Sequence, residues 1–282
     1  MPDQKPIIHW HQLLAELFRL MLSSLDVEVQ AEVNVLTKPP RADILLIRRK
    51  TAQWTKEQLT FIPSGIRSST APQILIEFKK TESLSTDAIV MLTAYHLFYC
   101  KSNRVNPTTV LPVLIVSKQP QRSRLAAFGF EPADEAGVYR CTNILAKQIL
   151  LITLNELETT VYNAFVQFFA SQGRVREQAL EQLQSVDLET IPEEVYWYAA
   201  GVWKQQNPNH GDKTMEATTT EQLIEDGRRF WKELILPTLS LQERLAGLKP
   251  EELAQALDEE QLKQLFALLQ NKLDRSAESP SE

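Results

Sequence analysis

Three charged residues, Glu77, Lys79 and Lys80, close a strand-like run at Ile74–Lys80, which reads Ile-Leu-Ile-Glu-Phe-Lys-Lys. Because successive side chains of a strand point to opposite faces, Glu77 and Lys79 share one face and Phe78 points to the other. The aliphatic residues before them predict a strand that is covered on both sides. A charge on such a strand is unfavourable unless it is compensated. The run therefore predicts either a salt bridge or a site that holds a metal ion and a phosphate.

A second carboxylate, Asp43, lies near the start of another aliphatic run, Ala42–Ile47. If the two strands lie together, Asp43 and Glu77 converge at one end of a sheet. Mg²⁺ takes carboxylate, phosphate and water oxygens, and the backbone carbonyl of Phe78 is a natural further ligand. Such an ion polarises a scissile phosphate and lowers the pKa of a bound water. Lys79 would hold that water or offset charge that develops on the phosphorane.

The alternative is an ion pair of Lys79 with Glu77 or Asp43 at a solvated end of the sheet. A Glu-x-Lys tripeptide alone favours this alternative, because strands with alternating charges produce it routinely. The metal site gains support only from the combination of Asp43, the aliphatic strands and the order of the elements.

The elements around these residues follow an α/β order. Residues 11–24 carry apolar side chains at helical spacing, and residues 27–35 alternate as a strand with one covered face does. The predicted order continues with a strand at 42–47, a long connection with a short helix at 55–59, the central strand at 73–79, a helix at 87–100 and a strand at 109–117. A helix between two buried strands indicates a crossover to a parallel neighbour. The fold class is therefore α/β.

The second half of the chain is expected to be mainly helical. The patterns predict short strands at 138–141 and 149–154, and helices at 157–171, across 175–236 with a polar break at 205–220, and from 250 to 258 with an apolar stripe beyond. We expect an α/β domain at 1–155, a helical extension at 156–236, a C-terminal helical hairpin at 237–275 and a disordered tail at 276–282. The aromatic cluster Tyr196, Trp197, Tyr198 and Trp203 could stack on bases, but its helical spacing in an acidic region favours a role in the core.

Asp43, the stretch Ile76-Glu77-Phe78-Lys79-Lys80-Thr81-Glu82-Ser83 and the element order over residues 9–118 together resemble the PD-(D/E)xK nuclease superfamily. The stretch 76–83 and Leu154-Asn155-Glu156-Leu157 are also similar to bacterial, often cyanobacterial, members grouped with recombination-promoting nucleases and transposase-like proteins. The resemblance implies a restriction-endonuclease-like core with a mixed central sheet flanked by helices, and an α-helical C-terminal region. It also implies metal ligands at Asp43 and Glu77, a catalytic lysine at Lys79, and a further metal ligand at Glu16 on the first helix.

Two features depart from the family pattern. The proline of the motif is only approximated, because Pro39 and Pro40 are separated from Asp43 by two residues. The Gln-x-x-x-Tyr pattern of the exonuclease branch reads Met91-x-x-x-Tyr95 here, without the glutamine. The second departure argues against handling of DNA ends more than against metal binding.

Charge is distributed unevenly along the chain. The net charge of −6 comprises +6 over residues 1–125 and −12 over residues 126–282. A basic N-terminal half permits a polyanionic partner. The candidate phosphate contacts in this half are Arg48, Arg49, Lys50, Arg67 and Lys80. The first three could equally form a solvated strand end.

Composition and motifs limit the classes of function that fit this chain. No apolar run is long enough for a membrane span, and two cysteines fit a reducing compartment, so we expect a cytoplasmic protein. These patterns, with the resemblance, predict a Mg²⁺- or Mn²⁺-dependent endonuclease that acts on DNA, with a link to recombination or mobile elements. The alternative is a catalytically inactive nuclease-fold protein that acts as a scaffold through its C-terminal helices. Those helices are also the predicted contact of a homodimer.

Overall fold

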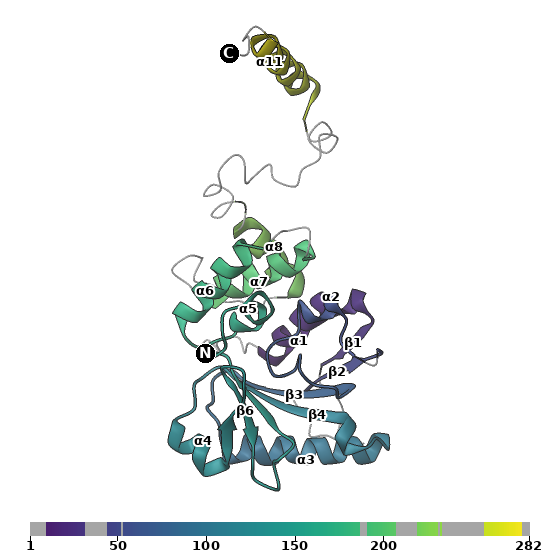
Figure 1. Cartoon of the computed structure of the whole chain (residues 1–282), viewed down its shortest axis with the longest axis vertical. Coiled ribbons are helices and arrows are strands. Elements are labelled where there is room, and N and C mark those ends of the chain that lie inside the picture. Colours follow the sequence, from purple (N-terminus) through teal and green to yellow (C-terminus); the bar gives the residue numbers. More distant parts are fainter. Residues whose placement is uncertain are drawn as a thin grey trace, which may run out of the picture. The chain divides into compact units, whose positions relative to one another are not determined.

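The computed structural model describes residues 10–31, 44–51, 53–186, 191–206, 219–230, 232 and 257–277 (Figure 1). The chain divides into two compact units, Met1–Glu233 and Leu234–Glu282. The first unit contains the sheet together with helices of the predicted extension. The described part of the second unit holds one helix, α11 (Glu259–Ala277). No helix among the described residues is long and apolar enough to cross a membrane.

Seven strands of the described residues form one mixed sheet in the first unit. Their order across the sheet is β1-β2-β3-β4-β7-β6-β5. The strands are β1 (Val27–Gln30), β2 (Ile44–Arg49), β3 (Gln73–Lys79), β4 (Val110–Val116), β5 (Phe130–Pro132), β6 (Val138–Cys141) and β7 (Leu150–Thr153). The three central strands β3, β4 and β7 are parallel, and the remaining neighbours pair antiparallel. This confirms the predicted α/β class and the parallel crossover.

The central strands are covered on both faces, as their aliphatic runs predict. In β3 the five residues from Ile74 to Phe78 are all buried, and only the two terminal residues are partly exposed. In β4 six of seven residues are buried. A charged residue within this part of the sheet is therefore largely removed from solvent.

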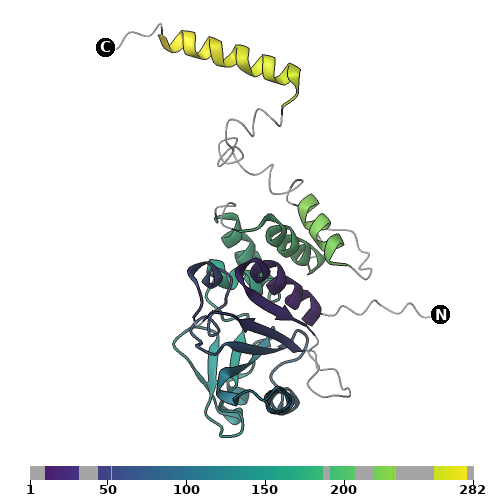
Figure 2. The same ribbon diagram turned by 90° about the vertical axis from the view of Figure 1, so that its right-hand side faces the viewer.

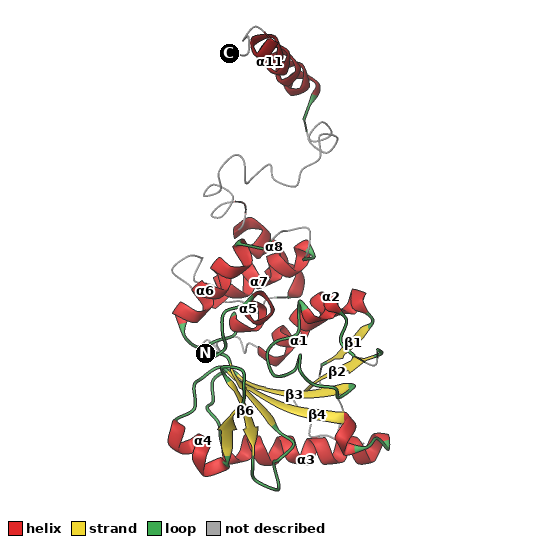
Figure 3. Ribbon diagram, in the orientation of Figure 1, coloured by secondary structure: helices red, strands yellow, loops and turns green. Residues whose placement is uncertain are grey.

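Helices pack on both faces of the sheet, as Figures 2 and 3 show. On one face, α3 (Thr86–Asn103) and α4 (Arg122–Phe128) share a hydrophobic cluster with Leu75 and Leu114. On the other face lies α1 (Trp10–Leu22), which buries Leu14, Leu17, Phe18 and Met21 and is followed by a short 3₁₀ turn, Ser23–Leu25. Leu75 and Glu77 share a face because they are two residues apart in β3, so Glu77 is on the α3 face.

Local capping explains where the helices next to β3 begin. Before β3, α2 (Lys56–Leu59) starts with a capping box in which Thr55 and Gln58 bond each other's backbone N–H. After β3, the Ser85 side chain accepts a hydrogen bond from the Ala88 backbone, and this ends the turn and begins α3. A left-handed Arg104 terminates α3, and the 3₁₀ turn Pro107–Thr109 leads into β4.

Among the described residues of the first unit, four helices form a helical layer: α5 (Val161–Gln167), α6 (Gly173–Gln184), α7 (Glu193–Gln206) and α8 (Thr220–Phe230). The helix predicted at 157–171 is longer than the observed α5, because the chain turns at 154–156 and the helix begins only after Thr160. Tyr196, Tyr198 and Trp203 are buried in this layer, which confirms their role in the core. The sequence did not predict α4 or β5.

Several predicted features lie outside the described residues. They include most of the strand predicted beyond residue 31, the polar break near residue 210, and residues 250–256 of the predicted helix. Residues 278–282 of the predicted tail also lie outside them, whereas α11 continues to Ala277.

Candidate active site

Glu77 and Lys79 form an ion pair at the end of β3. The Glu77 Oε1 atom lies 2.8 Å from Lys79 Nζ. The Glu77 side chain is only 5% exposed and that of Lys79 is 27% exposed. Their common face follows from the period of the strand, as predicted. A buried carboxylate beside a partly exposed ammonium forms a polar site in an otherwise apolar sheet.

Hydrogen bonds along β3 define the direction of its last carbonyl groups. The Lys79 carbonyl accepts a hydrogen bond from the Ser117 backbone, 3.0 Å away, on the β4 side. Because peptide groups alternate in direction along a strand, the Phe78 carbonyl is directed toward the β2 side. The described pairing of β2 ends there, with Ile44 opposite Glu77. A carboxylate and a backbone carbonyl therefore belong to the same strand end, and both are hard oxygen donors of the kind Mg²⁺ prefers.

Asp43 lies outside the described residues. Its successor in the chain, Ile44, is the residue that pairs with Glu77 across the sheet.

Glu16 lies on α1, on the face of the sheet opposite to α3. Its carboxylate pairs with Arg19, one turn further along the same helix. Burial is the main cause that raises the pKa of Tyr198, and the Glu16 charge raises it further. The structure thus places Glu16 beside Arg19 and Tyr198, and no contact found among the described residues joins it to Glu77 or Lys79.

Lys80 points to the opposite face from Lys79 and is largely buried. Its Nζ donates to the carbonyls of Phe169 (3.0 Å) and Ala170 (3.4 Å) and to the Gln206 side-chain oxygen. The same Nζ lies 4.7 Å from the ring centroid of Trp10. Burial, and secondarily the charge of Arg176, lowers the pKa of Lys80 to about 7. Lys80 connects the sheet to the helical layer, and this position does not favour the predicted contact with phosphate.

Arg48, Arg49 and Lys50 lie at the other edge of the sheet from Lys79. Because β2 runs antiparallel to β3, Arg48 pairs with Gln73 at the start of β3. Four strand residues, or about 13 Å, separate that position from Glu77. The sequence shows that these residues follow Asp43 closely along the chain. It does not show that β2 leads them away from the end of β3 that holds Glu77.

Each of these three side chains has protein partners. Arg48 contacts Glu28 at 3.1 Å and the Tyr99 hydroxyl at 3.3 Å, and Lys50 contacts Asp26 at 3.2 Å. The Arg49 side chain is buried, stacks on Trp54 at 4.8 Å, and donates to the Thr70 carbonyl at 2.7 Å.

The remaining predicted contact, Arg67, stacks on the Tyr162 ring at 3.6 Å. Stacking on an aromatic face is a common structural use of a guanidinium group. The structure therefore does not gather the predicted phosphate contacts around Glu77 and Lys79.

Sequence reasoning missed a basic segment at the same edge as Lys79. Residues 118–124 begin two residues after the end of β4 and read Lys-Gln-Pro-Gln-Arg-Ser-Arg, with no acid. Lys118, Arg122 and Arg124 are exposed. Arg124 donates to the Leu84 carbonyl at 2.8 Å, next to the start of α3. The signal was available in the sequence, because parallel strands end at the same edge of a sheet and this run follows the strand beside β3.

A second carboxylate, Glu156, lies just beyond the end of β7 at this edge. It accepts hydrogen bonds from Gln119 (2.5 Å), Tyr139 (2.7 Å) and Thr153 (2.6 Å). Burial and then this carboxylate raise the pKa of Tyr139 to about 12. The three donors hold Glu156 as the centre of a network that joins β6, β7 and the segment after β4.

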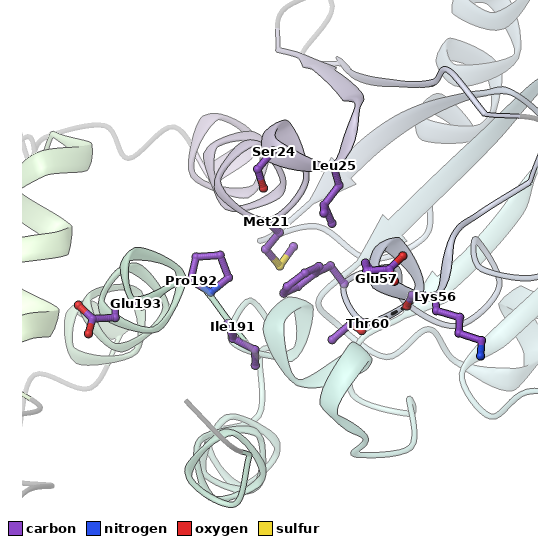
Figure 4. A pocket seen from close by; sticks show the side chains of 10 residues that line it. Met21, Ser24, Leu25, Lys56, Glu57, Thr60, Ile191, Pro192 and Glu193 are labelled. Atoms are coloured by element: carbon purple, nitrogen blue, oxygen red, sulfur yellow. Dashed lines mark hydrogen bonds between the residues drawn. The ribbon is translucent and has the colours of Figure 1, made fainter. Parts of the chain in front are cut away.

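A cavity among the described residues is lined by none of Glu77, Lys79 and Glu156. It has a volume of about 690 Å³ and lies between the end of α1, α2 and residues 191–193 (Figure 4). Met21, Leu25, Phe61 and Ile191 give it an apolar lining, with Lys56, Glu57 and Glu193 among its charged residues. None of the residues predicted for catalysis lines it.

Within the described ranges no cluster of three or more histidine, cysteine, aspartate or glutamate residues has the geometry to hold a metal ion. The two cysteines, Cys100 and Cys141, are buried, and burial raises the pKa of both thiols. Metal ligation at β3 would therefore need Glu77 together with a backbone carbonyl and Asp43 or solvent.

Comparisons with family models, with curated proteins and with solved structures find no match for this chain.

Proposed function

We propose that this protein is a metal-dependent DNA endonuclease of the PD-(D/E)xK type, with Asp43, Glu77 and Lys79 as its catalytic residues. The observation that carries the proposal is the Glu77–Lys79 pair at the end of a buried strand. A fold has little structural need for a carboxylate in the middle of its sheet, since burial of a charge is unfavourable. A buried carboxylate with a specific charged partner is a candidate for a functional group.

The oxygen donors at this strand end fit Mg²⁺ or Mn²⁺. Glu77 supplies a carboxylate and Phe78 a carbonyl directed to the β2 side. Asp43, which precedes Ile44 in the sequence, would supply a second carboxylate. When bound, the ion would polarise the scissile phosphate and lower the pKa of a coordinated water.

The residues of the chain have separate roles in phosphodiester hydrolysis. Lys79 Nζ, partly exposed and held 2.8 Å from Glu77, is positioned to donate to the attacking water or to a non-bridging phosphate oxygen. Glu77, held by the strand, orients Lys79 through their ion pair. Exposed Lys118 and Arg122, at the end of the neighbouring strand, would hold the flanking phosphates by charge.

Cleavage of supercoiled plasmid tests this function. Wild type is incubated with Mg²⁺, with Mn²⁺ or with EDTA, beside the variant Glu77→Gln. The proposal expects cleavage only with the metal, and a loss of at least about 100-fold in the variant, as for other groups that act in the transition state. The melting temperature of the wild type should also rise on metal addition, by linkage.

The form of the products separates the internal-cutting nuclease from one that digests ends. Nicked or linear plasmid shows internal cutting. A folded wild type that neither binds metal nor cuts plasmid or single-stranded DNA would contradict the proposal.

One observation favours the second candidate, an inactive scaffold with this fold. Glu77 and Lys79 neutralise each other at hydrogen-bonding distance, so the pair is stable without any metal ion. For a scaffold, the melting temperature would not respond to Mg²⁺ or Mn²⁺.

A further inference from the structure

An exposed apolar stripe runs along the outer side of α3. The side chains of Val90, Met91, Leu97 and Phe98 are 57%, 39%, 45% and 39% exposed. The opposite side of the same helix buries Ala88, Leu92, His96, Tyr99 and Cys100. A helix that is apolar on both sides is typically buried on both sides. Clustered apolar side chains on a surface mark an interaction site, whereas single ones do not.

The stripe is symmetric about Ala94. At about 100° per residue, Val90, Met91, Leu97 and Phe98 all lie within about 60° of Ala94 around the helix axis. In two antiparallel copies of α3 that cross at Ala94, each residue lies opposite the one equally far on the other side of position 94. Val90 then faces Phe98 of the other copy, and Met91 faces Leu97.

Charge at the two ends of the stripe follows the same symmetry. Asp87 and Lys101 are both exposed and each is seven residues from Ala94, on the same side of the helix. An antiparallel pair therefore brings Asp87 of each copy next to Lys101 of the other. A small residue at the centre, apolar residues on both sides and opposite charges at the ends make a self-complementary surface, as a twofold interface requires.

We propose that the protein forms a homodimer through α3, with the twofold axis at Ala94. The helix has 18 residues and a length of about 27 Å, which is long enough for four turns of contact. The symmetric arrangement of charge favours a second copy of this chain as the partner, because a surface that binds an unrelated protein does not need to be symmetric. This proposal does not depend on the proposed enzymatic function.

Two experiments on the full chain test the interface. In analytical ultracentrifugation at micromolar concentration, wild type should sediment as a dimer and Leu97→Glu as a monomer, with an unchanged circular dichroism spectrum for the variant. In mild oxidant, Ala94→Cys should form a disulfide-linked dimer, because the two copies of position 94 meet at the axis. The native cysteines are buried and do not compete.

Val90→Cys is the matched control for the register. In the proposed pair the two copies of position 90 are about 12 Å apart along the helix axis, so they should not cross-link. A monomeric wild type, equal cross-linking at positions 90 and 94, or a dimer that persists in Leu97→Glu but is lost in Leu265→Glu of α11 would each overturn the proposal.

Discussion

Lys79 and Lys80 show how strongly a one-residue step changes the role of a side chain. Lys79 lies beside Glu77 and keeps partial access to solvent. Lys80 points to the other face, where it donates to Phe169 and Ala170 and contacts Trp10. The first position suits chemistry on a substrate, and the second suits attachment of the helical layer to the sheet.

The lowered pKa of Lys80 should make stability depend on pH. In the unfolded chain a lysine has a pKa near 10.4, whereas burial lowers the pKa of Lys80 to about 7 in the folded protein. Between about pH 7 and 10 the unfolded state therefore binds more protons, and the free energy of unfolding rises with pH. The contribution of this residue is at most about 1.4 kcal/mol per pH unit.

Chemical denaturation of wild type and Lys80→Met between pH 6 and 10 would measure this dependence. The difference between the two proteins isolates Lys80 from all other titrating groups. We expect the free energy of wild type to rise relative to the variant above pH 7 and to show no relative slope below it. Parallel curves across the whole range would show that Lys80 has an ordinary pKa.

At this scale the sequence predicted Glu77 and Lys79 on one face, because strand period alone determines it. It could not predict the role of Lys80. That role depends on Trp10, Phe169 and Gln206, which are distant in the chain and meet only in the folded protein.

Among the elements, the direction of β2 has the largest consequence for the site. The antiparallel pairing of β2 with β3 brings Ile44 opposite Glu77 and carries Arg48 to the far edge. Parallel β4 and β7 end at the same edge as β3, so Lys118 and Glu156 lie there instead. The basic surface near the candidate site is therefore built from the segment after β4.

Close packing of α7 on α8 depends on glycine. A Cβ at Gly201 would overlap the backbone of Leu223, and one at Gly227 would overlap that of Trp197. Gly201→Ala should therefore lower the free energy of unfolding by about 1–3 kcal/mol, the usual effect of overpacking. Urea denaturation would measure it.

Gly173→Ala is the matched control for this prediction. Gly173 is also a helix residue, and an added Cβ there would meet nothing closer than 3.8 Å. Alanine at that position should be neutral or stabilise by about 0.4–1 kcal/mol. A Gly201→Ala variant as stable as Gly173→Ala would show that α7 and α8 are not packed backbone to backbone.

Aliphatic runs and helical periodicity predicted β3, β4, α1 and α3 well, because each is long and its pattern is regular. Short elements were less predictable. The seven residues of α4 and three of β5 carry too few apolar positions for a clear period. The short helix predicted at 55–59 is present as the four-residue α2, and a capping box at Thr55 and Gln58 stabilises its start.

The whole molecule combines a mixed α/β sheet, a helical layer in the same unit and a separate C-terminal unit. Because residues 126–282 are acidic, the proposed function assigns DNA contact to the edge at Lys79 and residues 118–124. The proposed function requires that the end of β3 is catalytic and not merely an ion pair.

The most direct test compares Lys79→Met with Lys80→Met. Both remove one lysine from the same strand end, and plasmid cleavage with Mg²⁺ or Mn²⁺ is measured at a temperature where circular dichroism shows both variants folded. We expect Lys79→Met to lose at least about 100-fold in rate. Lys80→Met should keep a rate within about threefold of wild type and show a lower melting temperature, because it loses buried hydrogen bonds. Unchanged cleavage in folded Lys79→Met would contradict the account.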